Sequence, residues 1–129
     1  MEHKEYRKLI EHRRSWYKTV KKVYCPCLKT DVIFNSKGFY HLRYDSTGKE
    51  RSIDEQMSRL SLLPFSIEMI SEAVKFYRHR KIKGLDYWSF QEAVGHKKVL
   101  TRVVLKKTTS EQVIFRSIFE KKDKKTVSK

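Results

Sequence analysis

Three stretches of alternating side chains restrict the fold of this sequence more than any other feature. They are Asp86–Val94, Lys98–Lys106 and Gln112–Glu120, and each is rich in the β-branched and aromatic residues that are typical of strands. The first link between them is short and carries Gly95, as suits a tight hairpin. The pattern therefore predicts three consecutive antiparallel strands.

The same alternation predicts which side chains share a face of the sheet, because successive side chains of a strand point to opposite faces. One face collects apolar residues that form a core, namely Trp88, Phe90, Val99, Val103 and Leu105, joined by Val113, Phe115 and Phe119 if the Lys106–Glu111 loop keeps the apolar sets together. The other face is half-polar and carries Tyr87, Ser89, Gln91, Arg102 and Arg116. We expect the functional site on this second face.

Helical patterns precede these strands. Apolar residues recur at helical spacing over residues 4–23, with Lys and Arg between them. Shorter helices are expected over Ser36–Tyr44, after the capping box Ser52–Glu55, and over residues 66–73. A fourth strand, at an edge, is expected within Val74–Ile82.

This order of elements predicts an α+β fold, with N-terminal helices packed on one face of a four-stranded antiparallel sheet. A chain of 129 residues has the size of a single domain. We assign residues 1–120 to this domain, which begins with the amphipathic helix 4–23. Residues 121–129 are expected to form a basic flexible tail.

The charge of the sequence restricts its partners. There are 30 Lys and Arg residues against 15 Asp and Glu residues, which gives a formal net charge of +15. Lys and Arg displace the counterions that condense on phosphate backbones, so the imbalance favours a nucleic-acid partner. The alternative is a basic protein whose charge only keeps it in solution.

Other classes of protein find less support. No apolar run approaches the ~20 residues that span a bilayer, and the charged N-terminus lacks the apolar core of a secretory signal, so we expect a cytoplasmic protein with no membrane partner. Cys25 and Cys27 are too close for an unstrained disulfide and are expected to be reduced thiols. No metal-ligand set or phosphate-binding glycine loop stands out, so no metal or cofactor is expected.

With no metal or cofactor expected, metal-independent cleavage of RNA fits the residue types that the sequence offers. Cleavage by the neighbouring 2′-hydroxyl needs a proton acceptor, a proton donor and cations for the charge on the phosphate oxygens. Histidine transfers protons near neutral pH, and arginine binds phosphate bidentately. The candidate catalytic residues are His41, Arg102 and Ser89. The candidate nucleic-acid-binding residues are Arg116, Tyr87, Arg78 and Arg43.

Each candidate also has a simpler interpretation. His41 lies between Phe39 and Leu42 in a short predicted helix, where a packed histidine fits as well as a catalytic one. Arg102 and Arg116 are also explained as surface charges of the sheet. Two adjacent arginines without an acidic partner repel each other, however, which favours an anionic ligand.

Two parts of the sequence resemble a known family. One is Val32–Tyr44, with the sequence VIFNSKGFYHLRY. The other is the set of strands that begins with YWSF at Tyr87, continues through Lys97–Leu105 and ends in Ile114–Phe119. Together they resemble small mobile-element proteins of the barnase, EndoU, colicin and RelE-like ribonuclease fold, over residues 25–120.

This resemblance implies a helical layer on a four-stranded antiparallel sheet and metal-independent cleavage of RNA on the open face. It carries over only His41, Arg102, Ser89 and Arg116 as site residues. A helix on the covered face would place His41 away from the arginines, unless that helix reaches round the edge of the sheet.

The functional hypotheses therefore fall into three classes. The first is a metal-independent endoribonuclease, such as a toxin or a mobile-element effector, with a protein partner that neutralises it. The second is a non-catalytic module in which the same arginines and aromatic residues bind RNA or DNA. The third is a small adaptor whose basic helix docks an acidic partner.

Overall fold

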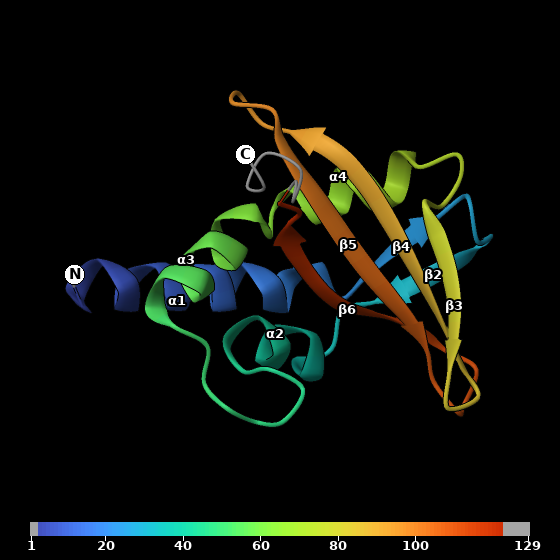
Figure 1. Cartoon of the computed structure of the whole chain (residues 1–129), viewed down its shortest axis with the longest axis horizontal. Helices are drawn as coiled ribbons and strands as arrows, with labels where there is room; N and C mark the ends of the chain where they lie inside the picture. The colour runs from blue at the N-terminus through green and yellow to red at the C-terminus, as the bar shows by residue number, and fades with distance from the viewer. Residues whose placement is uncertain (1–2, 123–129) are drawn as a thin grey trace, which may run out of the picture.

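Residues 3–122, which the computed structural model describes, form four helices and one six-stranded mixed sheet, in an α+β arrangement (Figure 1). The helices are α1 (His3–Val20), α2 (Ser36–Arg43), α3 (Ile53–Leu62) and α4 (Phe65–Glu72). The strands are β1 (Lys22–Cys25), β2 (Thr30–Ile33), β3 (Arg78–Ile82), β4 (Leu85–Val94), β5 (Val99–Lys107) and β6 (Val113–Glu120).

The strands are ordered β1-β2-β6-β5-β4-β3 across the sheet. β2 runs parallel to β6, and all other neighbours are antiparallel. The predicted antiparallel strands correspond to β3–β6, so that part of the prediction is confirmed. The predicted sheet of four strands is too small, because the β1–β2 hairpin extends it beyond β6.

The β1–β2 hairpin lies where the sequence predicts the end of a helix and a break. The helix predicted over residues 4–23 ends before Lys21, which turns the chain with a φ of 61°. The break predicted at Tyr24–Lys29 contains the end of β1 and the hairpin turn, which a hydrogen bond of 3.2 Å from the Lys29 amide to the Pro26 carbonyl closes. Strands of four residues are too short to show a clear alternation.

A β-bulge in β6 changes which side chains face the core. Leu105 lies opposite Phe115, but the preceding residue, Val104, lies opposite Ser117. Arg116 is therefore the extra residue of the bulge. The alternation predicted for β6 is reversed beyond this point.

The reversal exchanges the last two apolar residues of β6. Ile118 lies opposite Val103 and is fully buried, whereas Phe119 lies opposite Arg102 on the other face. The prediction that Phe119 joins the core face is therefore wrong. Other members of the predicted core face are buried, namely Phe90, Val103, Leu105, Val113 and Phe115.

β6 is the strand at which the sheet meets the helices. β2 pairs with only Val113 and Ile114 of β6, and within the described residues no strand pairs with the rest of that edge. α2 and α3 pack along β6 instead. At Gly38 of α2 a Cβ atom would lie only 2.7 Å from the carbonyl oxygen of Phe115, so this close approach requires glycine.

The helices do not form the single layer that the sequence predicts. α4 packs against β4 and β1, whereas α2 and α3 lie beside β6 and α1 packs outside α3 (Figure 1). Arg13 of α1 donates a hydrogen bond of 2.8 Å to the Leu60 carbonyl of α3. No helix of the described residues lies over the front of β3–β5 in Figure 1, so this face of the sheet is open.

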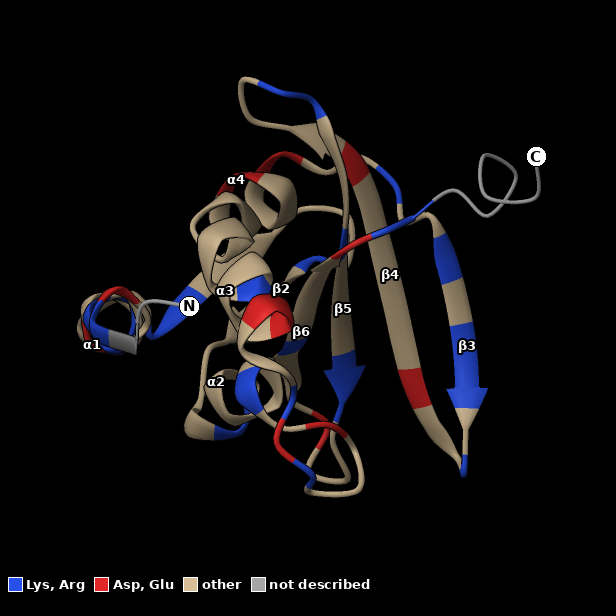
Figure 2. Cartoon of the chain, turned by 60° about the vertical axis from the view of Figure 1, so that its left-hand side comes forward, with Lys and Arg blue, Asp and Glu red and all other residues tan. Residues whose placement is uncertain are grey.

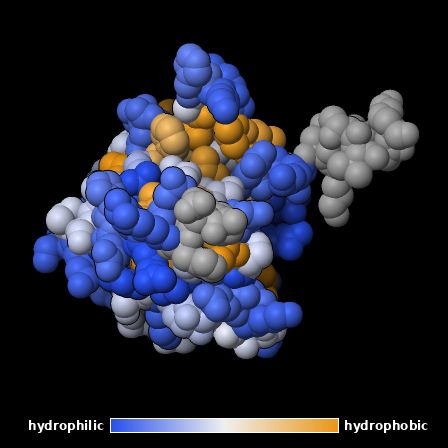
Figure 3. Space-filling model, turned by 90° about the vertical axis from the view of Figure 1, so that its left-hand side faces the viewer, coloured by the Kyte–Doolittle hydropathy of each residue, from blue (hydrophilic) through white to orange (hydrophobic). Residues whose placement is uncertain are grey.

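The face of the molecule that Figure 3 shows is mainly hydrophilic. Figure 3 shows the side that carries α1, α2 and α3, where hydrophilic residues surround a smaller hydrophobic patch in the upper part of the view. Within residues 3–122, none of the helices combines the length and the apolar character that crossing a membrane requires. Most of the predicted basic tail, residues 123–129, lies outside the described residues.

Candidate nucleic-acid interface

One face of strands β3–β6 concentrates basic side chains. Residues opposite one another on neighbouring antiparallel strands point to the same face. Tyr87 lies opposite both Arg80 and Lys106, and Ser89 lies opposite Arg78. We call this surface the basic face, and its cations are Arg78, Arg80, Arg102, Lys106 and Arg116.

The carboxylates of these strands lie on the opposite face. Asp86, Glu92 and Glu120 are the acidic residues of β3–β6, and each occupies a position that alternates with those of the basic face. Asp86 is hydrogen-bonded there to His79 Nε2 at 2.8 Å and forms an ion pair with Lys81 at 3.9 Å. Figure 2 shows Lys and Arg along β3, and the acidic positions towards the two ends of β4. The basic face therefore has no carboxylate from its own strands.

Arg102 lies in one part of the basic face, beside Gln91 and Tyr77. Its Nε atom donates a hydrogen bond of 3.0 Å to Gln91 Oε1, and its guanidinium lies 4.8 Å from the centroid of the Tyr77 ring. The guanidinium of Arg78 lies 5.7 Å from the same ring. Tyr77 is 51% exposed, so two cations flank an accessible aromatic ring, a combination that suits a nucleic-acid chain.

A second part of the basic face forms a pocket of about 280 Å³ with residues from α2 and α3. We call it the His41 pocket. α2 reaches this place because it packs along the part of β6 that lies beyond β2. The pocket is lined by His41, Asp45, Ser46, Arg51, Arg59, Tyr87, Val104, Arg116, Ser117 and Phe119.

Positive charge exceeds negative charge around this pocket. Arg51 and Arg59 both form ion pairs of 3.0 Å with Glu55, so a single carboxylate serves two guanidinium groups. Arg116 lies beside the Tyr87 hydroxyl and forms no ion pair with any residue of the described part of the chain. Burial lowers the pKa of Arg116 from its usual value, which indicates that its charge is poorly solvated and that an anion would stabilise it.

His41 is a neutral histidine among these cations. Burial lowers the pKa of its imidazole to about 4, and the nearby charges of Arg116 and Arg51 act in the same direction. The ring is therefore uncharged at pH 7 and can accept a proton. Its Nδ1 atom is buried and has no hydrogen-bond partner within residues 3–122. An unpaired buried nitrogen and a strongly shifted pKa in one pocket make His41 a candidate functional residue.

The structure brings three of the predicted site residues together and leaves two apart. His41, Arg116 and Tyr87 line the same pocket, whereas Arg102 and Ser89 lie on the same face but outside the pocket lining. Arg102 lies opposite a residue four positions beyond Tyr87 in β4, which corresponds to ~13 Å along a strand.

The other two predicted residues lie further from His41. Arg78 is at the exposed edge of the basic face, and Arg43 of α2 lies outside the His41 pocket, where it pairs with Glu50 at 3.9 Å. The expected separation of His41 from the arginines holds for Arg102 but not for Arg116.

Arg51 and Arg59 belong to the pocket although the sequence analysis did not select them. Arg59 follows Glu55 by four residues, a spacing that places both side chains on one side of α3, and Arg51 directly precedes the Ser52 cap of that helix. The Ser52 hydroxyl accepts a hydrogen bond of 3.2 Å from the Glu55 amide and fixes the start of α3. The spacing of Glu55 and Arg59 was visible in the sequence, but the packing of α3 against β6 was not.

The described residues contain no candidate metal centre. Nowhere within residues 3–122 do three His, Cys, Asp or Glu side chains gather as a ligand group. Cys25 is buried and Cys27 is half-buried, and both are free thiols.

Comparisons with known proteins assign no family to this chain. No family of known proteins matches it, and neither a curated protein nor a solved structure shows significant similarity. The function must therefore be inferred from the geometry and chemistry of the basic face and the His41 pocket.

Proposed function

We propose that this protein is a metal-independent endoribonuclease that binds RNA on the basic face and cleaves it in the His41 pocket. One observation carries the proposal: a neutral His41 imidazole lies in the same pocket as Arg116, on a sheet face without strand carboxylates. This combination provides a proton acceptor and a phosphate-binding cation within one site.

RNA binding rests on the five cations of the basic face. Each phosphate that they neutralise releases condensed counterions, so affinity falls as salt rises, with a slope of about −0.7 per contact for a single strand. Tyr77, which is 51% exposed and lies close to Arg78 and Arg102, provides a ring on which a base can stack.

Cleavage begins with proton transfer to His41. The imidazole takes the proton of the 2′-hydroxyl while the 2′-oxygen forms a bond to phosphorus and the bond to the 5′-oxygen breaks. The products are a 2′,3′-cyclic phosphate and a 5′-hydroxyl. Arg116 stabilises the charge on the phosphate oxygens, and the Tyr87 hydroxyl beside it supplies the proton to the departing 5′-oxygen. The bound phosphate offsets the surrounding positive charge and raises the pKa of His41 towards neutrality, where proton transfer is efficient.

The test is cleavage of a labelled single-stranded RNA in the presence of EDTA. His41→Ala should lower the rate by ~10²–10⁴-fold, the usual contribution of a general base. His96→Ala is the matched control, since His96 is exposed in the β4–β5 turn. A 2′-deoxy substitution at the scissile nucleotide should block cleavage. An unchanged rate in His41→Ala, or cleavage of the deoxy substrate, contradicts the proposal.

A second candidate function is a non-catalytic RNA- or DNA-binding module. It is favoured by the position of Tyr77, Arg78 and Arg102, which form a cationic and aromatic surface outside the His41 pocket. Salt-dependent binding without any cleavage by the wild-type protein would identify this function.

The proposal extends to a cellular role. We propose that the protein is related to the barnase, EndoU, colicin and RelE-like ribonuclease fold. Its proposed role is that of a cytoplasmic toxin or mobile-element effector. A neutralising protein partner would need an acidic surface complementary to the basic face. Expression of the wild type should arrest cell growth, whereas His41→Ala should not. Equal growth of both strains contradicts the effector role.

A further inference from the structure

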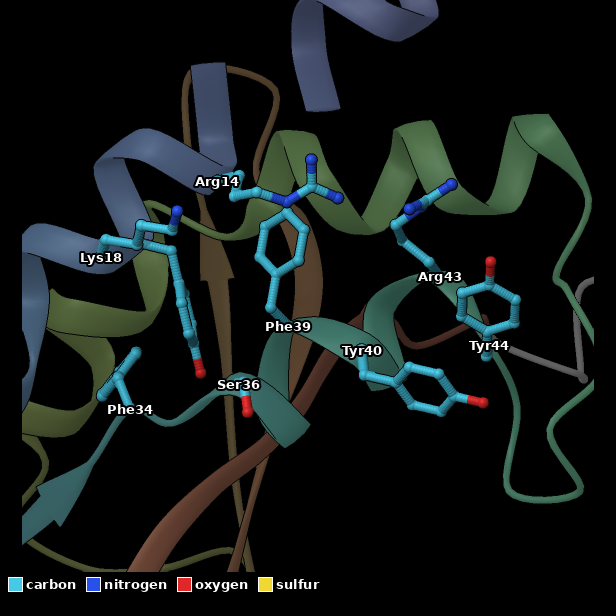
Figure 4. Close-up of a pocket in the computed structure, with 9 residues that line it drawn as sticks. Arg14, Lys18, Phe34, Ser36, Phe39, Tyr40, Arg43 and Tyr44 are labelled. Atoms are coloured by element: carbon cyan, nitrogen blue, oxygen red, sulfur yellow. The ribbon is translucent and has the colours of Figure 1, made fainter. Parts of the chain in front are cut away.

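A second pocket, of about 350 Å³, lies between α1 and α2 and plays no part in the chemistry proposed above. We call it the α1–α2 pocket. Its volume is within the range of about 300–1,000 Å³ that is usual for small-molecule sites. Figure 4 shows Arg14 and Lys18 reaching it from α1, and Phe39, Tyr40 and Arg43 reaching it from α2.

Aromatic rings form one side of this pocket. Tyr40 and Tyr44 are stacked, with their ring centroids 4.6 Å apart and an angle of 13° between the ring planes. Tyr40 is 45% exposed, and no other ring of the described residues lies parallel to it. The stacked pair therefore presents an accessible flat surface of the kind on which nucleobases stack.

The cations Arg14, Lys18 and Arg43 line the pocket together with Ser36, and no carboxylate does. The guanidinium of Arg14 lies 5.4 Å from the centroid of the Phe39 ring, and that of Arg43 lies 5.5 Å from the centroid of the Tyr44 ring. Arg14 and Lys18 form no ion pair with any residue in the described range. A ligand that is both aromatic and anionic fits this combination, and a nucleotide has both properties.

The α1–α2 pocket adjoins the His41 pocket through α2. Tyr40 lines the first and His41 lines the second, although they are consecutive residues. Their ring centroids lie 5.7 Å apart, with the rings at 76° to each other. An RNA strand that places a phosphate beside His41 therefore has a second binding pocket on the adjoining side of the same helix.

We propose that the α1–α2 pocket binds one nucleotide of the RNA strand that the His41 pocket cleaves, with the base stacked on Tyr40 and the phosphate held by Arg14 and Lys18. The inference rests on the proposed function, which supplies the RNA. It restricts the substrate class to unpaired RNA, because a base inside a duplex has both of its faces covered and cannot stack on a side chain.

Binding of a short single-stranded oligoribonucleotide tests this inference. A 2′-fluoro backbone keeps the RNA charge but lacks the hydroxyl that cleavage needs, so fluorescence anisotropy reports binding alone. Tyr40→Ala should weaken binding by about tenfold or more, as loss of one base–aromatic stack does. Tyr40→Trp should restore it, because a larger ring keeps the stack. Tyr24→Ala is the matched control, since Tyr24 is 54% exposed on β1 and does not line the pocket.

The outcomes separate this inference from the proposed ribonuclease activity. If the wild type cleaves RNA but Tyr40→Ala and Tyr24→Ala bind it equally well, the nucleotide pocket is wrong and the ribonuclease stands. If binding depends on Tyr40 but the wild type cleaves no RNA, the ribonuclease is wrong and the nucleotide pocket stands. Equal binding of single-stranded and duplex RNA by the wild type also overturns the inference.

Discussion

The two sides of α2 carry similar charge but different chemistry. In the His41 pocket the helix presents an imidazole to Arg116, Arg51 and Arg59, and in the α1–α2 pocket it presents the stacked Tyr40–Tyr44 pair to Arg14 and Lys18. The cations of either pocket suit a phosphate, but only the His41 pocket holds an imidazole that can accept a proton. Charge therefore indicates where an RNA backbone binds, and the uncharged groups beside it determine whether the strand is cleaved or held.

Replacement of Arg116 should separate the two pockets most clearly. Arg116→Ala removes the cation that stabilises the transition state and should lower kcat by ~10²–10³-fold, as the loss of one such donor does in other enzymes. Arg80→Ala is the control, because Arg80 lies on the basic face but not in the pocket lining. It should weaken RNA binding and leave kcat unchanged. Similar losses of kcat in both variants would show that kcat depends on the total charge of the basic face and not on the position of Arg116 in the pocket.

A change at Gly38 should disturb both pockets at once. A Cβ atom there would clash with the Tyr17 hydroxyl oxygen and lie 2.7 Å from the Phe115 carbonyl oxygen, so α2 must shift in Gly38→Ala. We expect a loss of about 1–3 kcal/mol in the free energy of unfolding, measured in urea, which is typical of overpacking. Lys37→Ala changes the exposed neighbour on the same helix and should leave stability nearly unchanged. Equal stability of the two variants would contradict the close packing of Gly38 against Tyr17 and Phe115.

The last prediction concerns pH and the His41 side of α2. The pKa of His41 is about 4 in the folded protein, below the value of ~6.5 in an unfolded chain. The unfolded state therefore binds more protons between these values, and stability is lost as the pH falls from about 6.5 towards 4. Thermal melting across this range should show a smaller acid loss for His41→Gln than for the wild type, whereas Tyr40→Phe should follow the wild type. Parallel curves for His41→Gln and the wild type contradict the shifted pKa.

Local sequence patterns were sufficient for the antiparallel half of the sheet. β4, β5 and β6 begin and end within one residue of the predicted strands, because each is long enough to show alternation and is bounded by turn residues. The start of α3 was equally clear, since the Ser52 cap is a local interaction. The patterns failed at β1 and β2, where four residues carry too little periodicity and the pairing of Val32 with Val113 joins distant parts of the chain.

The candidate site was predictable by residue type but not by grouping. His41, Tyr87 and Arg116 were selected for their chemistry, and they line one pocket. Arg102 was selected for the same reason but lies beside Gln91 instead. No sequence pattern distinguishes the two arginines, because the distance of each from α2 depends on the order of the strands and on where β2 stops pairing with β6.

Periodicity and composition established the antiparallel strands, the basic charge and the residue types suited to phosphate. These properties arise from neighbouring residues and from sums over the chain, so they can be read without coordinates. The bulge at Arg116, the short contact of β2 with β6 and the passage of α2 along the uncovered edge arise from packing between distant segments. That packing brought His41 to the basic face, because a helix can occupy the edge of β6 only where no strand pairs with it.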